Sequence, residues 1–329
     1  MTEPRSISRR DFLVTTAVAA ATTTLGFAAN TAAPAEPIID LHQHTDYGGQ
    51  RDAQWKTTRP GRNNEALIAH QRAMGITATI LLPAGHFVVR ESTHGGISNG
   101  LQSTCSSNEA CYALAKAHPG EFLFGANEVS DLDTAPQEIE KYLKLGAVII
   151  GEQKFGVECD SAAMQKLFVL AGAYNVPILM HWQYKMYNYG FERFYKMLEK
   201  HPKTNFIGHA QTWWANIDRN NKDDEKNLYP SGKMTPGGLT ERYLSDYPNM
   251  YADLSAGSGL NAVKRDGSGT TFLERHQDKL IYGSDCEDSV GRGGRCSGAL
   301  QIAQIRALAP SKAIERKILY GNAKKLFRL

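Results

Sequence analysis

The alternation of short apolar runs with longer amphipathic stretches most constrains how this chain can fold. Eight runs have the length and apolar character of buried strands: 37–44, 76–84, 122–129, 147–155, 176–183, 204–211, 249–257 and 279–285. Helical patterns such as NEALIAHQRAMG and SAAMQKLFVLAGAYN lie between them and end in the glycine or asparagine typical of helix C-termini. Eight parallel βα units on one unbroken chain predict an α/β fold, a single-domain (β/α)₈ TIM barrel. A doubly wound open sheet is the alternative, but no Gly-rich phosphate loop follows the first run.

Residues 1–35 have the pattern of an export signal. Arg9 and Arg10 precede an apolar stretch rich in Ala and Thr, and Ala33–Ala35 form a small-x-small cleavage site. The paired arginines resemble the twin-arginine (Tat) type of signal. We therefore expect cleavage of this segment, a barrel over 36–329, contact with the Tat export machinery, and a periplasmic or secreted protein. An uncleaved membrane anchor is the alternative, but the stretch is short for a bilayer span, so we expect no stable anchor.

Charge and cysteine content narrow the function classes further. The formal net charge is +3 at pH 7, which does not indicate nucleic-acid binding. An exported protein can form disulfides, and two pairs of cysteines are close in sequence. We expect Cys105 to pair with Cys111 and Cys286 with Cys296, leaving Cys159 free, although spacing alone does not determine connectivity.

Polar side chains stand where the apolar runs end. They are His42 and His44, Glu152 and Lys154, His181, His209, and Asp285. The C-terminal ends of barrel strands form the face that carries the active site, so we expect these side chains to converge there. His42 and His44 are two residues apart, so a regular strand would place both imidazoles on one face, as half of a site for a divalent metal.

The motifs HQH, GEQK, LMH, IGH and YGSD, in this order, resemble the amidohydrolase superfamily of metal-dependent barrel hydrolases. The C-terminal KILYGNAKKLFRL resembles the closing helix of its amidohydrolase-related branch. The resemblance implies a hydrolase that uses metal-activated water on an amide, ester or lactone bond of a small molecule. The branch also contains decarboxylases, so a metal-dependent decarboxylase or lyase of a small carboxylic acid is the alternative. A non-catalytic metal- or ligand-binding barrel is a third reading, and a homodimer is expected by analogy.

A metal site of His42, His44, His181 and Asp285 would offer nitrogen and oxygen ligands and leave a position open for water. Such a site suits Zn²⁺, with Mn²⁺ as the alternative. By the resemblance, Asp285 would also take a proton from the water and pass it to the leaving group. His209 would either bind a second metal or, as the favoured interpretation, donate a hydrogen bond to substrate or water.

The roles of Glu152 and Lys154 stay open at this point. Either could bridge two metals, or the two could form an internal ion pair that orients the histidines. Further residues are candidates to line the substrate pocket: Tyr184, Trp213, Arg62 and His86. The alternative is a hydrophobic loop anchor for Trp213 and a solvated loop for Arg62 and His86. Asp40 and Asp253 are expected to make structural hydrogen bonds or to support the metal ligands. The histidines near helices are expected at surface or capping positions: His70, His118, His201 and His276.

Overall fold

The computed structural model describes residues 36–45, 50–51, 57–59, 62–84, 107–224, 226–288, 291 and 296–329. Residues Pro37–Leu329 form one compact unit. None of its described helices has the length and apolar character needed to cross a bilayer. The predicted sites at His86 and Cys105 lie outside the described residues.

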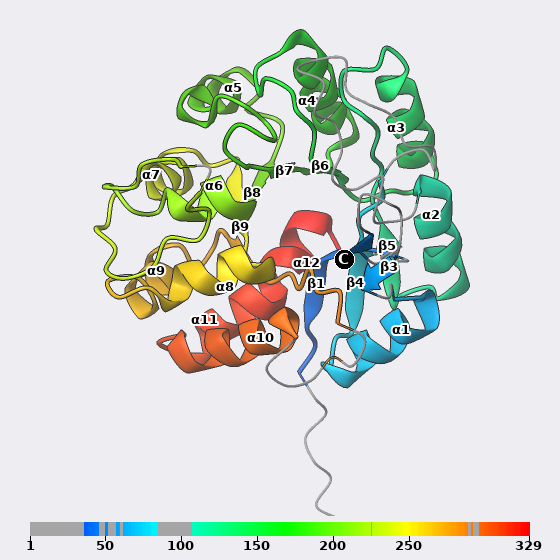
Figure 1. Ribbon diagram of the computed structural model, residues 1–329. Helices are drawn as coiled ribbons and strands as arrows, with labels where there is room; N and C mark the ends of the chain where they lie inside the picture. The colour runs from blue at the N-terminus through cyan, green and yellow to red at the C-terminus, as the bar shows by residue number, and fades with distance from the viewer. Residues whose placement is uncertain are drawn as a thin grey trace, which may run out of the picture. The chain divides into compact units, whose positions relative to one another are not determined.

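Parallel strands form a closed barrel in the order of the predicted runs (Figure 1). In the described part of the chain they are β1 (Ile39–Gln43), β4 (Ala78–Leu81), β5 (Phe122–Phe124), β6 (Ile150–Gln153), β7 (Ile178–His181), β8 (Phe206–His209), β9 (Met250–Asp253) and β10 (Leu280–Ile281). They pair as β1-β4-β5 and β10-β9-β8-β7-β6. Backbone hydrogen bonds join the two sheets at both seams, from Leu41 N to Tyr282 O (3.2 Å) and from Val148 N to Phe124 O (2.9 Å). The (β/α)₈ barrel is therefore confirmed.

Helices surround the strands. They are α1 (Asn64–Ala73), α2 (Asn108–Ala117), α3 (Ala135–Lys144), α4 (Ala162–Tyr174), α5 (Tyr195–Lys200), α6 (Ala210–Ala215), α7 (Leu239–Asp246), α8 (Ala256–Lys264), α9 (Thr270–Arg275), α10 (Ser297–Leu308), α11 (Lys312–Arg316), α12 (Asn322–Phe327), the 3₁₀ turn η1 (Phe191–Arg193) and the π-helical turn η2 (Lys317–Gly321). Their ends follow local sequence signals. The side chain of Ser161 accepts a hydrogen bond from Met164 N at the start of α4, and Asn175 ends α4 with φ 56°.

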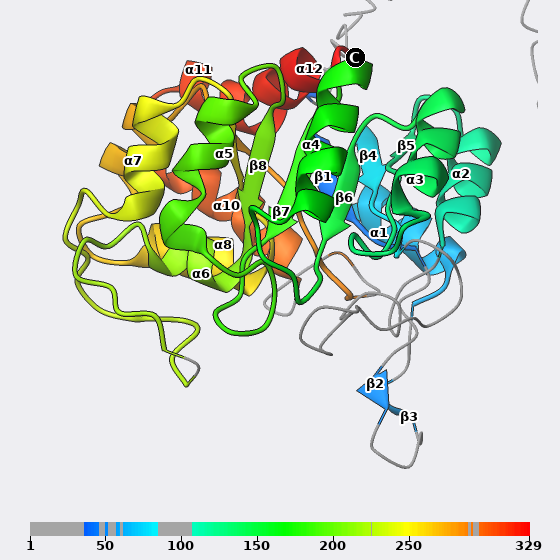
Figure 2. The ribbon, with the colours of Figure 1, turned by 90° about the horizontal axis from the view of Figure 1, so that it is seen from above.

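A short antiparallel hairpin was not predicted. It consists of β2 (Gln50–Arg51) and β3 (Thr57–Arg59) and lies between β1 and α1 in the chain. Figure 2 shows the hairpin beyond one end of the barrel and α12 at the other end. The hairpin follows the C-terminal end of β1, so it belongs to the face where active sites of barrel enzymes lie.

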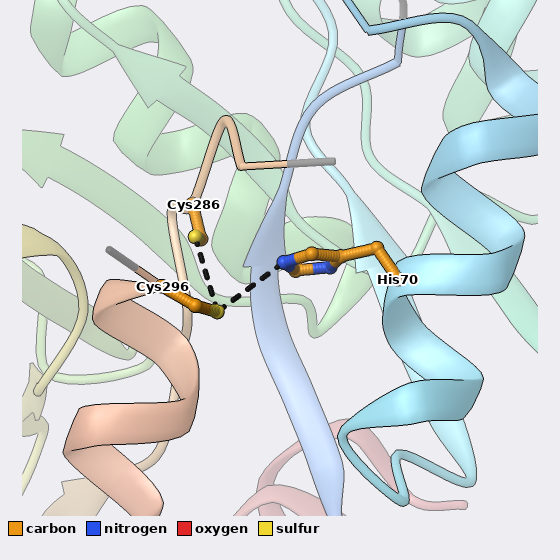
Figure 3. A group of neighbouring side chains, drawn as sticks. All are labelled: His70, Cys286 and Cys296. Atoms are coloured by element: carbon orange, nitrogen blue, oxygen red, sulfur yellow. Dashed lines mark hydrogen bonds between the residues drawn. The ribbon is translucent and has the colours of Figure 1, made fainter. Parts of the chain in front are cut away.

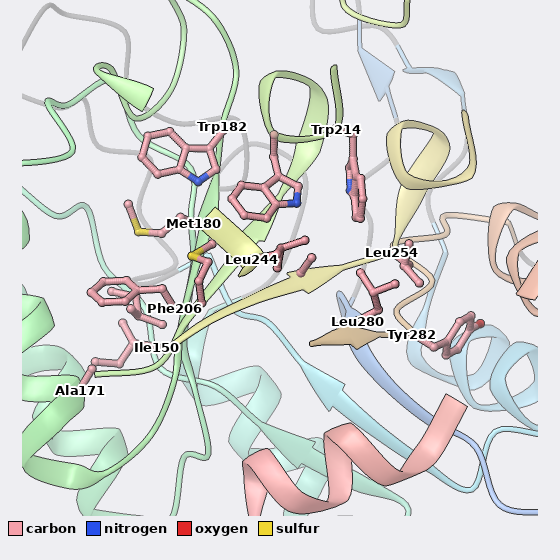
Figure 4. Packing of buried hydrophobic residues seen from close by; sticks show 14 of the residues in the cluster. Ile150, Ala171, Met180, Trp182, Phe206, Trp214, Leu244, Leu254, Leu280 and Tyr282 are labelled. Atoms are coloured by element: carbon pink, nitrogen blue, oxygen red, sulfur yellow. The ribbon is translucent and has the colours of Figure 1, made fainter. Parts of the chain in front are cut away.

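Two apolar layers hold the barrel. The inner layer takes side chains from strands all round the barrel and from α12: Ile39, Leu41, Ile80, Leu82, Ile149, Leu179, Ile207, Ile281, Ala323, Leu326 and Phe327. The larger outer layer packs strands against helices, with Trp182, Phe206 and Trp214 among its buried members (Figure 4). Full burial of one such side chain contributes about 1.5–3 kcal/mol. Helix α12 thus closes the end of the barrel opposite the C-terminal ends of the strands.

Strand β1 departs from regular alternation. Ile39 and Leu41 belong to the inner layer, so simple alternation would bring Gln43 inward and keep His42 out. The pairing of β1 with β4 instead shifts register between Asp40 and Gln43. Asp40 makes the structural hydrogen bonds expected of it, because its carboxylate accepts from His42 N (3.0 Å) and from Gln71 of α1 (2.8 Å).

Candidate metal centre

His42 and His44 leave β1 with their rings turned toward each other. Their Nε2 atoms lie 3.1 Å apart, and both side chains are buried. His44 Nδ1 donates to the carbonyl oxygen of Leu82 (2.7 Å), and His42 Nδ1 donates to Asp253 Oδ2 (2.7 Å). Because each Nδ1 carries its ring's proton in the neutral form, the two Nε2 atoms face each other with lone pairs.

Glu152 and Asp285 add carboxylate oxygens to this pair. Glu152 Oε2 lies 3.5 Å from His42 Nε2 and 3.4 Å from His44 Nε2. Asp285 Oδ1 lies 3.7 and 3.5 Å from the same two nitrogen atoms. Ligand atoms around a tetrahedral zinc ion lie roughly 3.4 Å apart, since each bond is about 2.0–2.2 Å long. The distances from the two nitrogen atoms to these oxygens are therefore on the scale of a coordination shell.

A second group shares the carboxylate of Glu152. Its other oxygen, Oε1, contacts His181 Nδ1 and lies 3.6 Å from His209 Nε2. His181 Nδ1 hydrogen-bonds the Glu152 carboxylate, while its Nε2 lies 3.4 Å from Gln183 Oε1. Asp285 Oδ2 lies 3.7 Å from His209 Nε2. Glu152 therefore stands between two groups of potential ligands, His42 with His44 and His181 with His209.

Asp253 and Ser255 set the orientation of the histidines. Asp253 Oδ2 accepts from both His42 Nδ1 and His209 Nδ1, at 2.7 and 3.1 Å, and from Ser255 Oγ at 2.7 Å. Its other oxygen accepts from Ser255 N (2.9 Å). From the sequence the role of Asp253 stayed open, and Ser255 was not predicted. The sequence did contain a signal for Asp253, because Asp253 ends β9 just as His181 and His209 end β7 and β8.

The charges of the centre favour ionised carboxylates. Burial acts to raise the pKa of Glu152, but His181, Lys154 and His42 outweigh it and hold that pKa well below its usual value. Burial and the charge of Lys154 lower the pKa of His181 to about 4. For His42, burial favours the neutral ring, but Asp285 and the neighbouring carboxylates outweigh it and raise the pKa. A buried positive charge is therefore favoured among these side chains.

Two backbone features bring Asp285 to the centre. Asp285 has φ 40° and donates its N–H to His42 O (2.8 Å), so the chain turns sharply after β10. Gly283 lies where a Cβ atom would come within 2.5 Å of Asp253 Oδ1 and 2.9 Å of His42 Cβ. The glycine of the YGSD motif therefore leaves room for the side chains of the neighbouring strands.

Of the predicted substrate-lining residues that the structure describes, Tyr184 lines a cavity, whereas Trp213 and Arg62 have structural contacts. Tyr184 lines a cavity of about 370 Å³ beside Gln183, the residue that contacts His181. Trp213 is fully buried, and its ring occupies the space next to Gly208, so it belongs to the core. Arg62 donates to the backbone oxygens of Cys286 (2.6 Å) and His44 (3.3 Å) and to Gln43 Oε1 (2.6 Å). It thus ties the end of β1 to the loop that follows β10.

Lys154 lies at the rim of the centre. Its Nζ is 5.7 Å from the centroid of the Tyr187 ring, and its charge lowers the pKa values of both Glu152 and His181. Of the two open candidates for a bridging ligand, Glu152 has the position between the histidines.

The cysteine and histidine expectations are partly overturned. Cys286 and Cys296 are free thiols with their sulfur atoms 3.4 Å apart, so the predicted disulfide is absent, while Cys159 is free as expected. His70 is buried on the inner face of α1 rather than at the surface. His118, His201 and His276 stand at the C-caps of α2, α5 and α9, as predicted.

Two family models match the chain. A family model described as Amidohydrolase matches residues 39–329, and a model of the twin-arginine translocation signal sequence matches residues 6–26. No curated protein matches the chain.

Solved structures share the fold at low identity. An uncharacterized TIM-barrel protein from Bordetella bronchiseptica is 16% identical, with a TM-score of 0.59 over 89% of this chain and 99% of that one. A 2,6-dihydroxybenzoate decarboxylase from Rhizobium is 15% identical (TM-score 0.54; 89% and 99%). A probable 2-pyrone-4,6-dicarboxylic acid hydrolase from Acinetobacter baumannii with citric acid bound is 13% identical (TM-score 0.55; 89% and 99%). With a family model spanning most of its length and a Tat signal before it, this chain belongs to the amidohydrolase family and is exported to the periplasm or beyond.

Proposed function

We propose that the protein is a metal-dependent hydrolase of an amide, ester or lactone bond in a small molecule. One observation supports this most strongly: the Nε2 atoms of His42 and His44 lie 3.1 Å apart beside two carboxylates whose pKa values are lowered. The carboxylates favour a buried positive charge here, which a bound cation would supply in place of a proton on His42. The donor set suits Zn²⁺, with Mn²⁺ as the alternative.

The residues fit two neighbouring cations. His42, His44, Glu152 Oε2 and Asp285 would hold the first. Glu152 Oε1, His181 Nδ1 and His209 Nε2 would hold the second. This division differs from the sequence-based set, which placed His181 with His42 and His44 and favoured a single metal. The support for the change is that Glu152 offers one oxygen to each pair of histidines.

When bound, the metal lowers the pKa of water to about 7 and polarises a substrate carbonyl. Asp285 would take a proton, and this is supported by a carboxylate that faces the centre and a side chain that is 21% exposed, unlike the buried Glu152. Its lowered pKa keeps it ionised at neutral pH; burial opposes this, but the charges of His42 and His44 prevail. The carboxylic acid thus formed would return the proton to the leaving group.

The cavity beside Gln183 provides a place for the substrate. Tyr184, Tyr189 and Phe191 contribute aromatic surface, and Asn188 and Thr212 contribute polar groups. Its volume of about 370 Å³ suits a small molecule rather than a polymer. We propose an aromatic or otherwise apolar group as the part of the substrate that it holds.

A panel of aromatic amides, esters and lactones, assayed with Zn²⁺- or Mn²⁺-loaded protein, tests the proposal. We expect turnover of at least one class and its loss in Asp285→Asn, with the fold kept by circular dichroism. Full activity in Asp285→Asn would contradict the mechanism. A matched control is Asp288→Asn, three residues later in the same loop, which should keep the activity.

Decarboxylation is the second candidate. Lys154 favours it, because an ammonium group beside Glu152 and His181 could hold a substrate carboxylate. A relative of the same fold is a 2,6-dihydroxybenzoate decarboxylase. Release of CO₂ from a panel of hydroxybenzoates, with no hydrolysis of the esters and lactones, would establish this reading instead. The homodimer stays a prediction.

A further inference from the structure

We infer that Cys286, Cys296 and His70 form a separate metal site, apart from the histidine–carboxylate centre, for a thiophilic ion such as Zn²⁺ or Cu⁺. The three side chains come from the loop after β10, the start of α10 and the middle of α1, and converge in the interior (Figure 3). Their exposed fractions are 3%, 0% and 0%. This cluster is separate from the histidine–carboxylate centre, and the inference does not depend on the proposed function.

The distances have the scale of metal coordination. Cys296 Sγ lies 3.4 Å from Cys286 Sγ and 3.4 Å from His70 Nε2. Around a tetrahedral ion with bonds of about 2.3 Å to sulfur and 2.0–2.1 Å to nitrogen, such atoms lie roughly 3.5–3.8 Å apart. An expansion of a few tenths of an ångström would therefore admit the ion.

A chain of hydrogen bonds prepares His70 as a ligand. The amide nitrogen of Gln71 donates to Asp40 Oδ2 and to Thr79 Oγ1, both at 2.8 Å, which fixes the orientation of the amide. Gln71 Oε1 therefore accepts from His70 Nδ1 (2.9 Å). The proton of the ring is on Nδ1, so the lone pair of Nε2 points toward Cys296, as in metal-bound histidines whose other nitrogen is hydrogen-bonded.

Two more groups surround Cys296 Sγ. The backbone N–H of Ala299, in the first turn of α10, donates to it (3.3 Å), and an N–H donor stabilises a thiolate. The thioether sulfur of Met74, one turn after His70, lies 3.6 Å away. Two thiols, an imidazole and a thioether are the soft donor set that selects thiophilic ions over Mg²⁺ or Ca²⁺.

The export route favours metal over a disulfide here. Tat substrates fold before export, so this cluster assembles in a compartment that keeps thiols reduced. The ion would then join α1, α10 and the loop after β10. Since Cys286 directly follows Asp285, the site would hold the proposed catalytic loop in place.

Cobalt titration of purified, reduced protein tests the site. Only sulfur ligands give thiolate-to-Co²⁺ charge-transfer absorption, so the histidine–carboxylate centre is silent in this measurement. We expect the absorption to saturate at about one equivalent of sulfur-bound Co²⁺ per chain. It should disappear in Cys296→Ser and remain in Cys159→Ser, a matched control at another buried cysteine. Displacement of Co²⁺ by Zn²⁺ or by Cu⁺ then identifies the preferred ion.

His70→Ala keeps both thiols, so it tests the site even if Cys296→Ser does not fold. It should weaken Co²⁺ binding about tenfold or more in competition with a chelator. Three results would overturn the inference: no charge-transfer absorption in the reduced wild type, equal absorption in folded Cys296→Ser, or a Cys286–Cys296 disulfide in freshly exported protein.

Discussion

At the residue scale, the hydrogen bonds made by the far nitrogen of each histidine decide which atom can bind a cation. His42 and His44 donate from Nδ1 to Asp253 and to the Leu82 carbonyl, so both rings turn Nε2 toward the centre. His181 is oriented differently, with Nδ1 toward Glu152 and Nε2 toward Gln183. Sequence alone identified the histidines but not these orientations, because Asp253, Leu82 and Glu152 belong to other βα units.

Asp253 supports two histidines at once, which makes it a sensitive position. Asp253→Asn removes a carboxylate that accepts from both His42 and His209, so we expect about 10–100-fold weaker metal binding with the fold retained. Metal affinity by competition with a chelator checks this. The control is Asp246→Asn, an exposed residue at the end of α7. Unchanged affinity in Asp253→Asn would show that the histidines need no such support.

Gly283 is a second sensitive position, because a methyl group there would press on Asp253 and His42. We expect Gly283→Ala to lower the free energy of unfolding by about 1–3 kcal/mol and to reduce metal content. Urea unfolding and metal analysis measure the two effects. Gly257→Ala is the matched control, since its nearest contact would be Tyr229 at an ordinary 3.7 Å. Equal behaviour of the two variants would contradict the packing argument.

At the scale of elements, the alternation of side chains predicted which residues face the centre in regular strands but not in irregular strands. Leu179 and Ile207 are in the inner layer, and His181 and His209 follow two residues later toward the same side. In β6, Ile149 is in the inner layer, but Glu152, three residues later, reaches the centre after a register shift between Ile150 and Gln153. The strand runs and several helices were therefore predictable, whereas the shifts in β1 and β6 depend on pairing with neighbouring strands.

The segment after α6 is held by one buried ion pair. Asp218 accepts from the backbone N–H groups of Asn220 (2.9 Å) and Thr235 (3.1 Å) and pairs with Arg265 (2.5 Å). Burial acts to raise the pKa of Asp218, but these partners outweigh it and lower the pKa. The pair therefore stabilises the fold above the unfolded pKa of about 3.9, and this contribution is lost as pH falls through the lower folded value.

We expect Asp218→Asn to lower the free energy of unfolding by about 3 kcal/mol at neutral pH, because Arg265 stays buried without its partner charge. The difference from wild type should shrink below about pH 4. Urea unfolding at neutral and acid pH measures it. Asp278→Asn, whose side chain is 72% exposed beside Lys317, should cost less than about 1 kcal/mol. A pH-independent loss in Asp218→Asn would contradict the ionic explanation.

At the scale of the whole molecule, the barrel gathers side chains that are far apart in sequence at one end. His42 and Asp253 are separated by 211 positions, yet they share a hydrogen bond. Order along the chain and barrel topology were enough to predict this convergence. The grouping around Glu152 and the cluster at His70 were not predictable, because they depend on side-chain directions.

Export is also a property of the whole chain. Replacing both Arg9 and Arg10 by lysine should retain the protein in the cytoplasm, because the matched signal contains this pair. Cell fractionation measures the distribution, with Arg5→Lys, outside the matched segment, as the control. Normal export of the double variant would exclude the Tat route.

The metal content of His42→Ala and His181→Ala, compared with wild type by elemental analysis, tests the central claim most directly. The comparison isolates the histidine–carboxylate centre, because neither change touches the sulfur cluster. We predict that each variant loses about one equivalent of Zn²⁺ or Mn²⁺ relative to wild type, one from each side of Glu152. Metal contents equal to that of wild type in both variants would contradict the proposed metal centre.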